Sequence, residues 1–109
     1  MFILGEQTGL EVIMELIMYG GDAKSNSMEA IQAAKTGDFE LAKTKLSQAE
    51  ASLIHAHHAQ TGLLTQEAQG NKAEVSLLMV HGQDHLMTSI AFTDLAKEII
   101  ELYERINKK

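Results

Sequence analysis

Apolar residues recur near the period of an α-helix along residues 71–108, and they do so on two sides of that helix. At about 100° per residue, one stripe contains Val75, Met79, Leu86 and Ile90. A second stripe, nearly opposite, contains Leu77, Val80, Met87, Ala91 and Leu95. Because a helix in an isolated three-helix bundle needs only one apolar stripe, the pattern predicts burial on both sides, most simply through self-association. The alternative is an exposed apolar patch without a role.

Two breaks that contain glycine divide the chain into three helical segments. Gly37 before Asp38 is typical of a helix C-cap followed by an N-cap. Gly70 before Asn71 has the same pattern, and Glu74 completes a sequence typical of a capping box. The predicted helices therefore cover about residues 5–36, 38–69 and 71–108.

Short connections make neighbouring helices antiparallel. The predicted fold is therefore all-α: an antiparallel up-down-up three-helix bundle, in a single domain spanning residues 1–109. The weak point is the pair Gly20 and Gly21, because two adjacent glycines cost a helix about 2 kcal/mol relative to alanine. We expect the first helix to bend or split there.

Composition excludes several classes of protein. The chain has 15 acidic and 9 basic residues, and its net charge of -6 argues against nucleic acid or an anionic membrane as a partner. It has no cysteine, which excludes a disulfide scaffold, a thiolate zinc site and a cysteine nucleophile. No apolar run is long enough to span a bilayer, and residues 1–10 lack the pattern of a secretory signal. We expect a soluble, cytoplasmic protein.

Asp84 points close to the middle of the second apolar stripe, between Val80 and Met87. A lone ionised carboxylate buried there would cost several kcal/mol. If this helix lies on a symmetry axis, several Asp84 carboxylates meet, and a hard cation such as Mg²⁺ would relieve their repulsion. The alternative is a protonated or hydrogen-bonded aspartic acid in the core.

The five histidines form two groups: His55, His57 and His58, and then His81 and His85. His81 lies three residues before Asp84, at the edge of the second stripe and so at the rim of a subunit interface. A neutral imidazole there can act as a nucleophile at pH 7, and Gly82 beside it leaves room for a reactant or another backbone. His81 and His85 could equally share a metal ion or form an ordinary surface pair. The residues alone leave these three readings open.

The run VHGQDHLMT at Val80–Thr88 closely resembles the active-site segment of the lactose/cellobiose-type enzyme IIA of the bacterial sugar phosphotransferase system. Three further segments resemble the same family: Gly21–Ser25, Met28–Phe39 and Ala56–Thr61. Together these matches cover about residues 10–107.

The resemblance implies a homotrimer of three-helix subunits whose first helix is largely continuous. It assigns His81 as the residue that accepts a phosphoryl group from phospho-HPr and passes it to a cysteine of the cognate enzyme IIB, for uptake of a disaccharide as its phosphate ester. Asp84 matches an aspartate that three subunits contribute to one central metal ion, for which we expect Mg²⁺. Gln83, His57 and Gln60 match positions near the site.

Two other readings stay open beside this one. A metal-binding helical bundle would use four histidines as ligands, namely His57, His58, His81 and His85. A plain helical interaction module would tolerate replacement of His81. A carrier with a net charge of -6 must also accept an anion, so we expect a neutral or apolar docking surface around His81 that includes Met79 and Met87.

Overall fold

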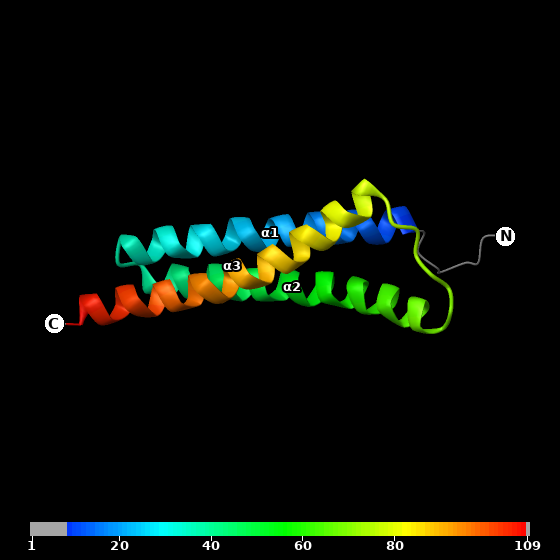
Figure 1. Cartoon of the computed structure of the whole chain (residues 1–109). Helices are drawn as coiled ribbons and strands as arrows, with labels where there is room; N and C mark the ends of the chain where they lie inside the picture. The colour runs from blue at the N-terminus through cyan, green and yellow to red at the C-terminus, as the bar shows by residue number, and fades with distance from the viewer. Residues whose placement is uncertain (1–8, 109) are drawn as a thin grey trace.

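A computed structural model describes residues 9–108 and contains three long helices and no strand in that range (Figure 1). They are α1 (Gly9–Lys35), α2 (Phe39–Ala68) and α3 (Leu77–Asn107). The helices lie side by side in a rod of 62 × 22 × 21 Å, with α2 antiparallel to α1 and α3. The predicted all-α, up-down-up bundle is confirmed.

Both predicted helix C-caps are present. Gly37 has φ +84°, its N–H donates to the Ala34 carbonyl at 3.1 Å, and the N–H of Asp38 donates to the Ala33 carbonyl at 2.9 Å. This is the Schellman arrangement, in which glycine adopts the left-handed conformation without a Cβ penalty. Asp38 then caps α2, because its side chain accepts from the N–H of Leu41 at 3.1 Å.

The same arrangement ends α2 at Gly70, which has φ +94°. The predicted capping box at Asn71, however, is wrong. The N-cap of α3 is Ser76, whose side chain accepts from the N–H of Met79 at 3.1 Å. Val75, which we placed on the first apolar stripe, is 79% exposed, so a helical turn before Ser76 would bury little apolar surface. The chain therefore crosses from α2 to α3 without helical structure.

Helix α1 runs unbroken through Gly20 and Gly21, so the expected split is wrong and the continuity implied by the family resemblance is confirmed. Gly20 is buried against α3, where a Cβ would lie 3.1 Å from the carbonyl oxygen of His85. Ser89 also donates a hydrogen bond to the Gly20 carbonyl at 2.7 Å. Close packing of the two helices thus offsets the poor helix propensity of glycine.

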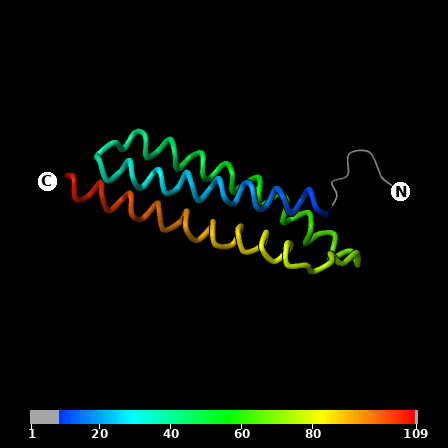
Figure 2. Tube along the Cα trace, turned by 90° about the horizontal axis from the view of Figure 1, so that it is seen from above, coloured from blue at the N-terminus to red at the C-terminus, as the bar shows by residue number. Residues whose placement is uncertain are grey.

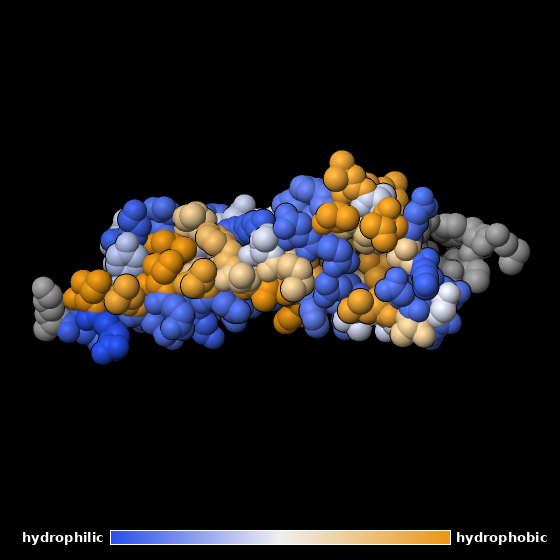
Figure 3. All heavy atoms as spheres, in the orientation of Figure 1, coloured by the Kyte–Doolittle hydropathy of each residue, from blue (hydrophilic) through white to orange (hydrophobic). Residues whose placement is uncertain are grey.

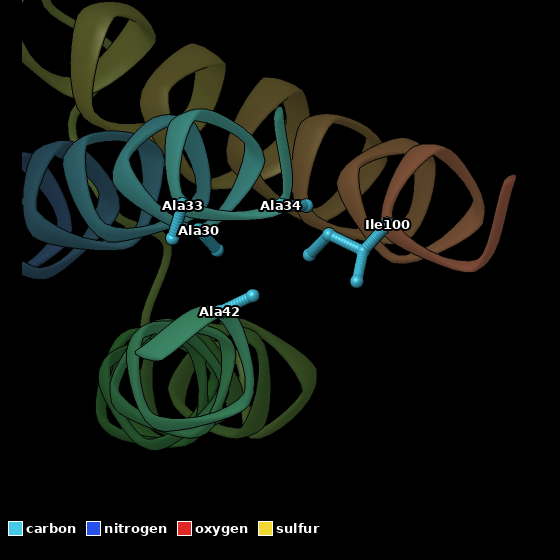
Figure 4. Close-up of a cluster of buried hydrophobic side chains, with 5 residues drawn as sticks. All are labelled: Ala30, Ala33, Ala34, Ala42 and Ile100. Carbon is cyan, nitrogen blue, oxygen red and sulfur yellow. The ribbon is translucent and has the colours of Figure 1, made fainter. Parts of the chain in front are cut away.

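Small residues make up most of the core. At the end of the bundle near the α1–α2 turn, three alanines of α1 meet Ala42 of α2 and Ile100 of α3 (Figure 4). At the other end, Leu16 and Leu86 are the largest fully buried side chains and pack with Ala56 and Ala59. Alanine at helix contacts lets the helix axes approach closely, so the inner faces leave space for few large side chains.

Helix α1 packs along both other helices, whereas α2 and α3 contact each other much less. Seen from above, α1 lies between α2 and α3 at the end that contains the α1–α2 turn (Figure 2). The outer face of α3 is left open, and apolar side chains gather along it (Figure 3). All members of the second predicted stripe are exposed in the single chain: Leu77, Val80, Met87, Ala91 and Leu95.

Candidate functional site

The two histidines of α3 form a pair in which one ring is exposed and the other is half-buried. The rings of His81 and His85 meet edge to face, with centroids 4.6 Å apart and planes at 84°. His81 is exposed, whereas Nδ1 of His85 is buried and has no hydrogen-bond partner among the described residues. Helical spacing of four residues brings the rings together, so His85 limits the positions that the His81 ring can adopt.

The surroundings of His85 favour its neutral form. Burial lowers the pKa of His85, and the nearby Lys24 ammonium and His81 lower it further, while the Asp84 carboxylate raises it. The net direction is down from the ordinary value of 6.5. His81 therefore packs against an uncharged ring at neutral pH.

Gly82 lies on the inner side of α3, not beside an open reaction space. It is buried, and a Cβ would lie 3.4 Å from the Leu16 Cβ and 3.5 Å from the Ile13 Cγ2. Of the two expectations for Gly82, room for a reactant is therefore wrong, whereas close approach of another backbone is confirmed, because a Cβ would also lie 3.5 Å from the Ile13 carbonyl oxygen. Its missing side chain lets α3 approach α1 closely at the level of His81.

Two of the predicted neighbours meet across α2 and α3. Gln60 donates a hydrogen bond to Gln83 at 2.7 Å, and its Nε2 also lies 3.8 Å from the sulfur of Met87. Met79, which we expected at a docking surface, is buried beneath this contact and is only 8% exposed. Met87 is 56% exposed, in agreement with that expectation.

The histidines of α2 lie elsewhere. His57 and His58 are exposed and line a shallow groove of about 410 Å³ with Ile90 of α3. His55 stacks on Tyr19 of α1, with ring centroids 4.8 Å apart. Within residues 9–108 of one chain, no three histidine or carboxylate side chains come together as a metal site. The four histidines named as ligands of a metal-binding bundle are therefore not assembled by this fold.

Asp84 lies on the open outer face of α3, where the second stripe places it. Its carboxylate is exposed in the single chain and makes no ion pair with a described residue. The side chain of Thr88 donates to the Asp84 backbone carbonyl at 2.7 Å, which leaves the carboxylate oxygens available to ligands. One chain supplies a single carboxylate at this position.

The profile of the family described as "PTS system, Lactose/Cellobiose specific IIA subunit" matches residues 11–104, which is most of the chain and includes the whole pair of histidines. The chain belongs to this family. It is therefore an enzyme IIA component of a phosphotransferase system. No helix within residues 9–108 has the length and apolar character needed to cross a membrane.

Curated relatives agree with this assignment. The lichenan-specific enzyme IIA component of Bacillus subtilis is 52% identical over 91% of this chain and 90% of its own length. The lactose-specific component of Streptococcus mutans is 47% identical over 84% of this chain and 88% of its own length.

Solved structures of other family members have the same fold. The cellobiose-specific enzyme IIA of Bacillus anthracis superposes with a TM-score of 0.90, at 41% identity, over 95% of this chain and 96% of that chain. The chitobiose enzyme IIA of Escherichia coli, solved in complex with HPr, superposes with a TM-score of 0.81, at 41% identity, over 94% of this chain and 99% of that chain.

Lys24 is a further candidate residue that the sequence did not single out as functional. It lies on α1 and lines an open groove of about 460 Å³ with Thr88 and Phe92 of α3. Among the described residues of α1 and α3, the lysines and arginines nearest to it along the helices are Lys35 and Lys97, and both lie several turns away. This isolation is a signal visible in the sequence, but only the fold brings Lys24 beside the histidine pair.

Proposed function

We propose that His81 is the residue on which this IIA component carries phosphate. The observation that supports this most directly is its exposed imidazole, held beside the neutral ring of His85 within the segment that resembles the family's active site. An exposed ring nitrogen can attack phosphorus in line with the leaving group. The protein contributes position and charge stabilisation, because phosphoryl transfer needs little other covalent chemistry.

We propose phospho-HPr as the donor and a cysteine of enzyme IIB as the acceptor. In the first step, a nitrogen of His81 forms a bond to phosphorus while the phosphorus–nitrogen bond of the donor histidine breaks. In the second step, the acceptor thiolate forms a bond to phosphorus while the bond to His81 breaks. The solved complex of a 41% identical chitobiose IIA with HPr supports the choice of donor. The lichenan and lactose relatives support a disaccharide of the lactose/cellobiose type as the transported sugar.

We also propose that three chains assemble along the outer face of α3. The inner faces are filled mainly by small residues, while the large apolar side chains of α3 stay exposed, as with Leu77 at 85% and Leu95 at 61%. Burial of such side chains against copies of the same face would stabilise a trimer.

In such a trimer, three Asp84 carboxylates would approach one another. Two unit charges about 4 Å apart repel by about 4 kcal/mol at an effective dielectric constant near 20. Mg²⁺ prefers oxygen ligands such as carboxylates, so the Asp84 side chain fits this ion. Three chains would supply three such ligands. Bound there, Mg²⁺ would offset two of the three negative charges and so reduce the repulsion between the carboxylates.

The test of His81 is phosphorylation by phospho-HPr followed by intact-mass measurement under non-acidic conditions. We expect the wild type to gain the mass of one phosphoryl group and His81→Ala to gain none. His58→Ala, which removes an exposed histidine of α2, is the matched control and should be phosphorylated normally. A phosphorylated His81→Ala protein would refute the assignment.

A further inference from the structure

The groove between α1 and α3 is lined by one lysine and has a largely apolar surface. Its lining consists of Lys24, Ser25, Met28, Thr88 and Phe92. The Lys24 side chain is half-buried, and none of the carboxylates in the described chain pairs with it. An ammonium without a counter-ion attracts an anion.

The register of α1 against α3 places Lys24 on the side of the bundle that carries the histidine pair. Helical side chains lean toward the N-terminus of their own helix. Because α1 and α3 are parallel, Lys24 leans from the level of Thr88 and Phe92 back toward His85, which packs on Gly20 one turn earlier in α1.

No other basic side chain of α1 or α3 can take this position. Lys97 is about 24 Å along α3 from His81, and Lys35 is about 16 Å along α1 from Lys24, at 1.5 Å per residue. The protein carries a net charge of -6, so the phosphoryl dianion must be accepted against the field of the whole molecule.

We propose that Lys24 is the cation that stabilises the phosphoryl group while it resides on His81. The proposal rests on the proposed role of His81. During the transfer, the phosphorus–nitrogen bond to the donor breaks as the bond to His81 forms, and Lys24 keeps its protons throughout. Its fixed positive charge lowers the free energy of the phosphorylated state and of the transition state that leads to it.

The test measures both the rate and the equilibrium of phosphoryl transfer between HPr and the IIA protein. The variants are Lys24→Met, which keeps the apolar stem, Lys24→Arg, which keeps the charge, and Lys72→Met, which removes a lysine from the connection between α2 and α3. For Lys24→Met we expect an equilibrium constant about tenfold lower, with a slower forward rate. Lys24→Arg should remain within about twofold of the wild type, and Lys72→Met should be unchanged.

Circular dichroism and urea unfolding identify any loss of structure. If Lys24→Met unfolds, Lys24→Gln is measured in its place, because glutamine keeps a polar end without the charge. A folded, neutral variant with wild-type rate and equilibrium would overturn the role of Lys24 while leaving His81 as the carrier. Absence of phosphorylation in the wild type would instead overturn the proposed function itself. Failure of Lys24→Arg to restore transfer would overturn the electrostatic explanation.

Discussion

The two faces of α3 differ in how much of their apolar surface a single chain buries. The inner face carries Gly82, Leu86 and Ser89, all buried against α1 and its neighbours. The outer face carries larger apolar side chains and Asp84, all exposed in the single chain. The inner face is buried within one subunit, whereas the outer face is where we propose that other subunits bind. His81 lies between the two, so under the proposed function one helix has separate positions for folding, for assembly and for phosphoryl transfer.

A charge on the outer face should have the largest effect. We expect Val80→Glu to dissociate the proposed trimer, because the substitution places one carboxylate per chain in the seam beside Asp84. The helical content should stay the same, since Val80 is 52% exposed in the single chain. Sedimentation velocity or light scattering measures the change in mass.

The control for this experiment is Ile54→Glu, which places the same charge at a 67% exposed apolar position of α2. If Ile54→Glu dissociates the assembly while Val80→Glu does not, the interface lies on α2. A wild type that is monomeric at every accessible concentration would contradict the assembly itself.

Truncation of adjacent residues on the two faces should separate folding from assembly. Leu86 is fully buried, so Leu86→Ala should destabilise the subunit by about 2–5 kcal/mol at any protein concentration. Met87→Ala, one residue later on the outer face, should lower the stability only at protein concentrations at which the proposed trimer forms. Urea unfolding across a dilution series measures both effects. Equal losses for both variants in dilute protein would contradict the distinction between the faces.

The sequence predicts those features that depend on a few neighbouring residues. The caps at Gly37 and Asp38 follow from local backbone chemistry, and the structure has both. The start of α3 at Ser76 was missed, because Asn71 can also cap a helix. Whether the helix begins at Asn71 or at Ser76 depends on whether the residues between them would bury apolar surface as a helical turn. The local sequence pattern does not contain that information.

The same contrast holds at the candidate site. The helical periodicity places Asp84 near the middle of the second stripe of α3 and His81 at its edge, and the family resemblance supplies the hypothesis for their roles. The position of Lys24 in the groove between α1 and α3 could not be predicted from spacing, because it depends on how the two helices pack. For Gly82 the sequence left two alternatives open, a reactant or another backbone, since a glycine inside a helix does not indicate which face of the helix it lies on; the structure confirms the second.

The two glycines of α1 offer a smaller and matched test of packing against α3. Gly20→Ala should destabilise the fold by about 1–2 kcal/mol, because the new Cβ meets the carbonyl oxygen of His85 at 3.1 Å and a backbone atom cannot move aside cheaply. Gly21→Ala should stabilise it by about 0.5–1 kcal/mol, since its Cβ meets nothing within 4 Å and alanine favours the helix. Thermal unfolding of both variants measures the difference. If Gly20→Ala instead stabilised the fold and Gly21→Ala destabilised it, α1 and α3 would not be in close contact at His85.

The smallest effect we expect concerns pH, at the boundary between the two faces. The folded chain holds the pKa of His85 below its ordinary value, through burial, Lys24 of α1 and His81, against the opposing charge of Asp84. The unfolded chain therefore binds more protons than the folded chain as the pH falls through about 6.5, and stability decreases in that window. An NMR titration of the His85 ring should give a midpoint below 6.5, and the midpoint should rise in Lys24→Met because one cause of the depression is removed. The dependence of urea unfolding on pH between neutral and mildly acidic conditions should weaken in His85→Gln. A His85 midpoint at or above the ordinary value would mean that the ring is not desolvated against α1, and the close approach of the two helices at Gly20 would then have to be reconsidered.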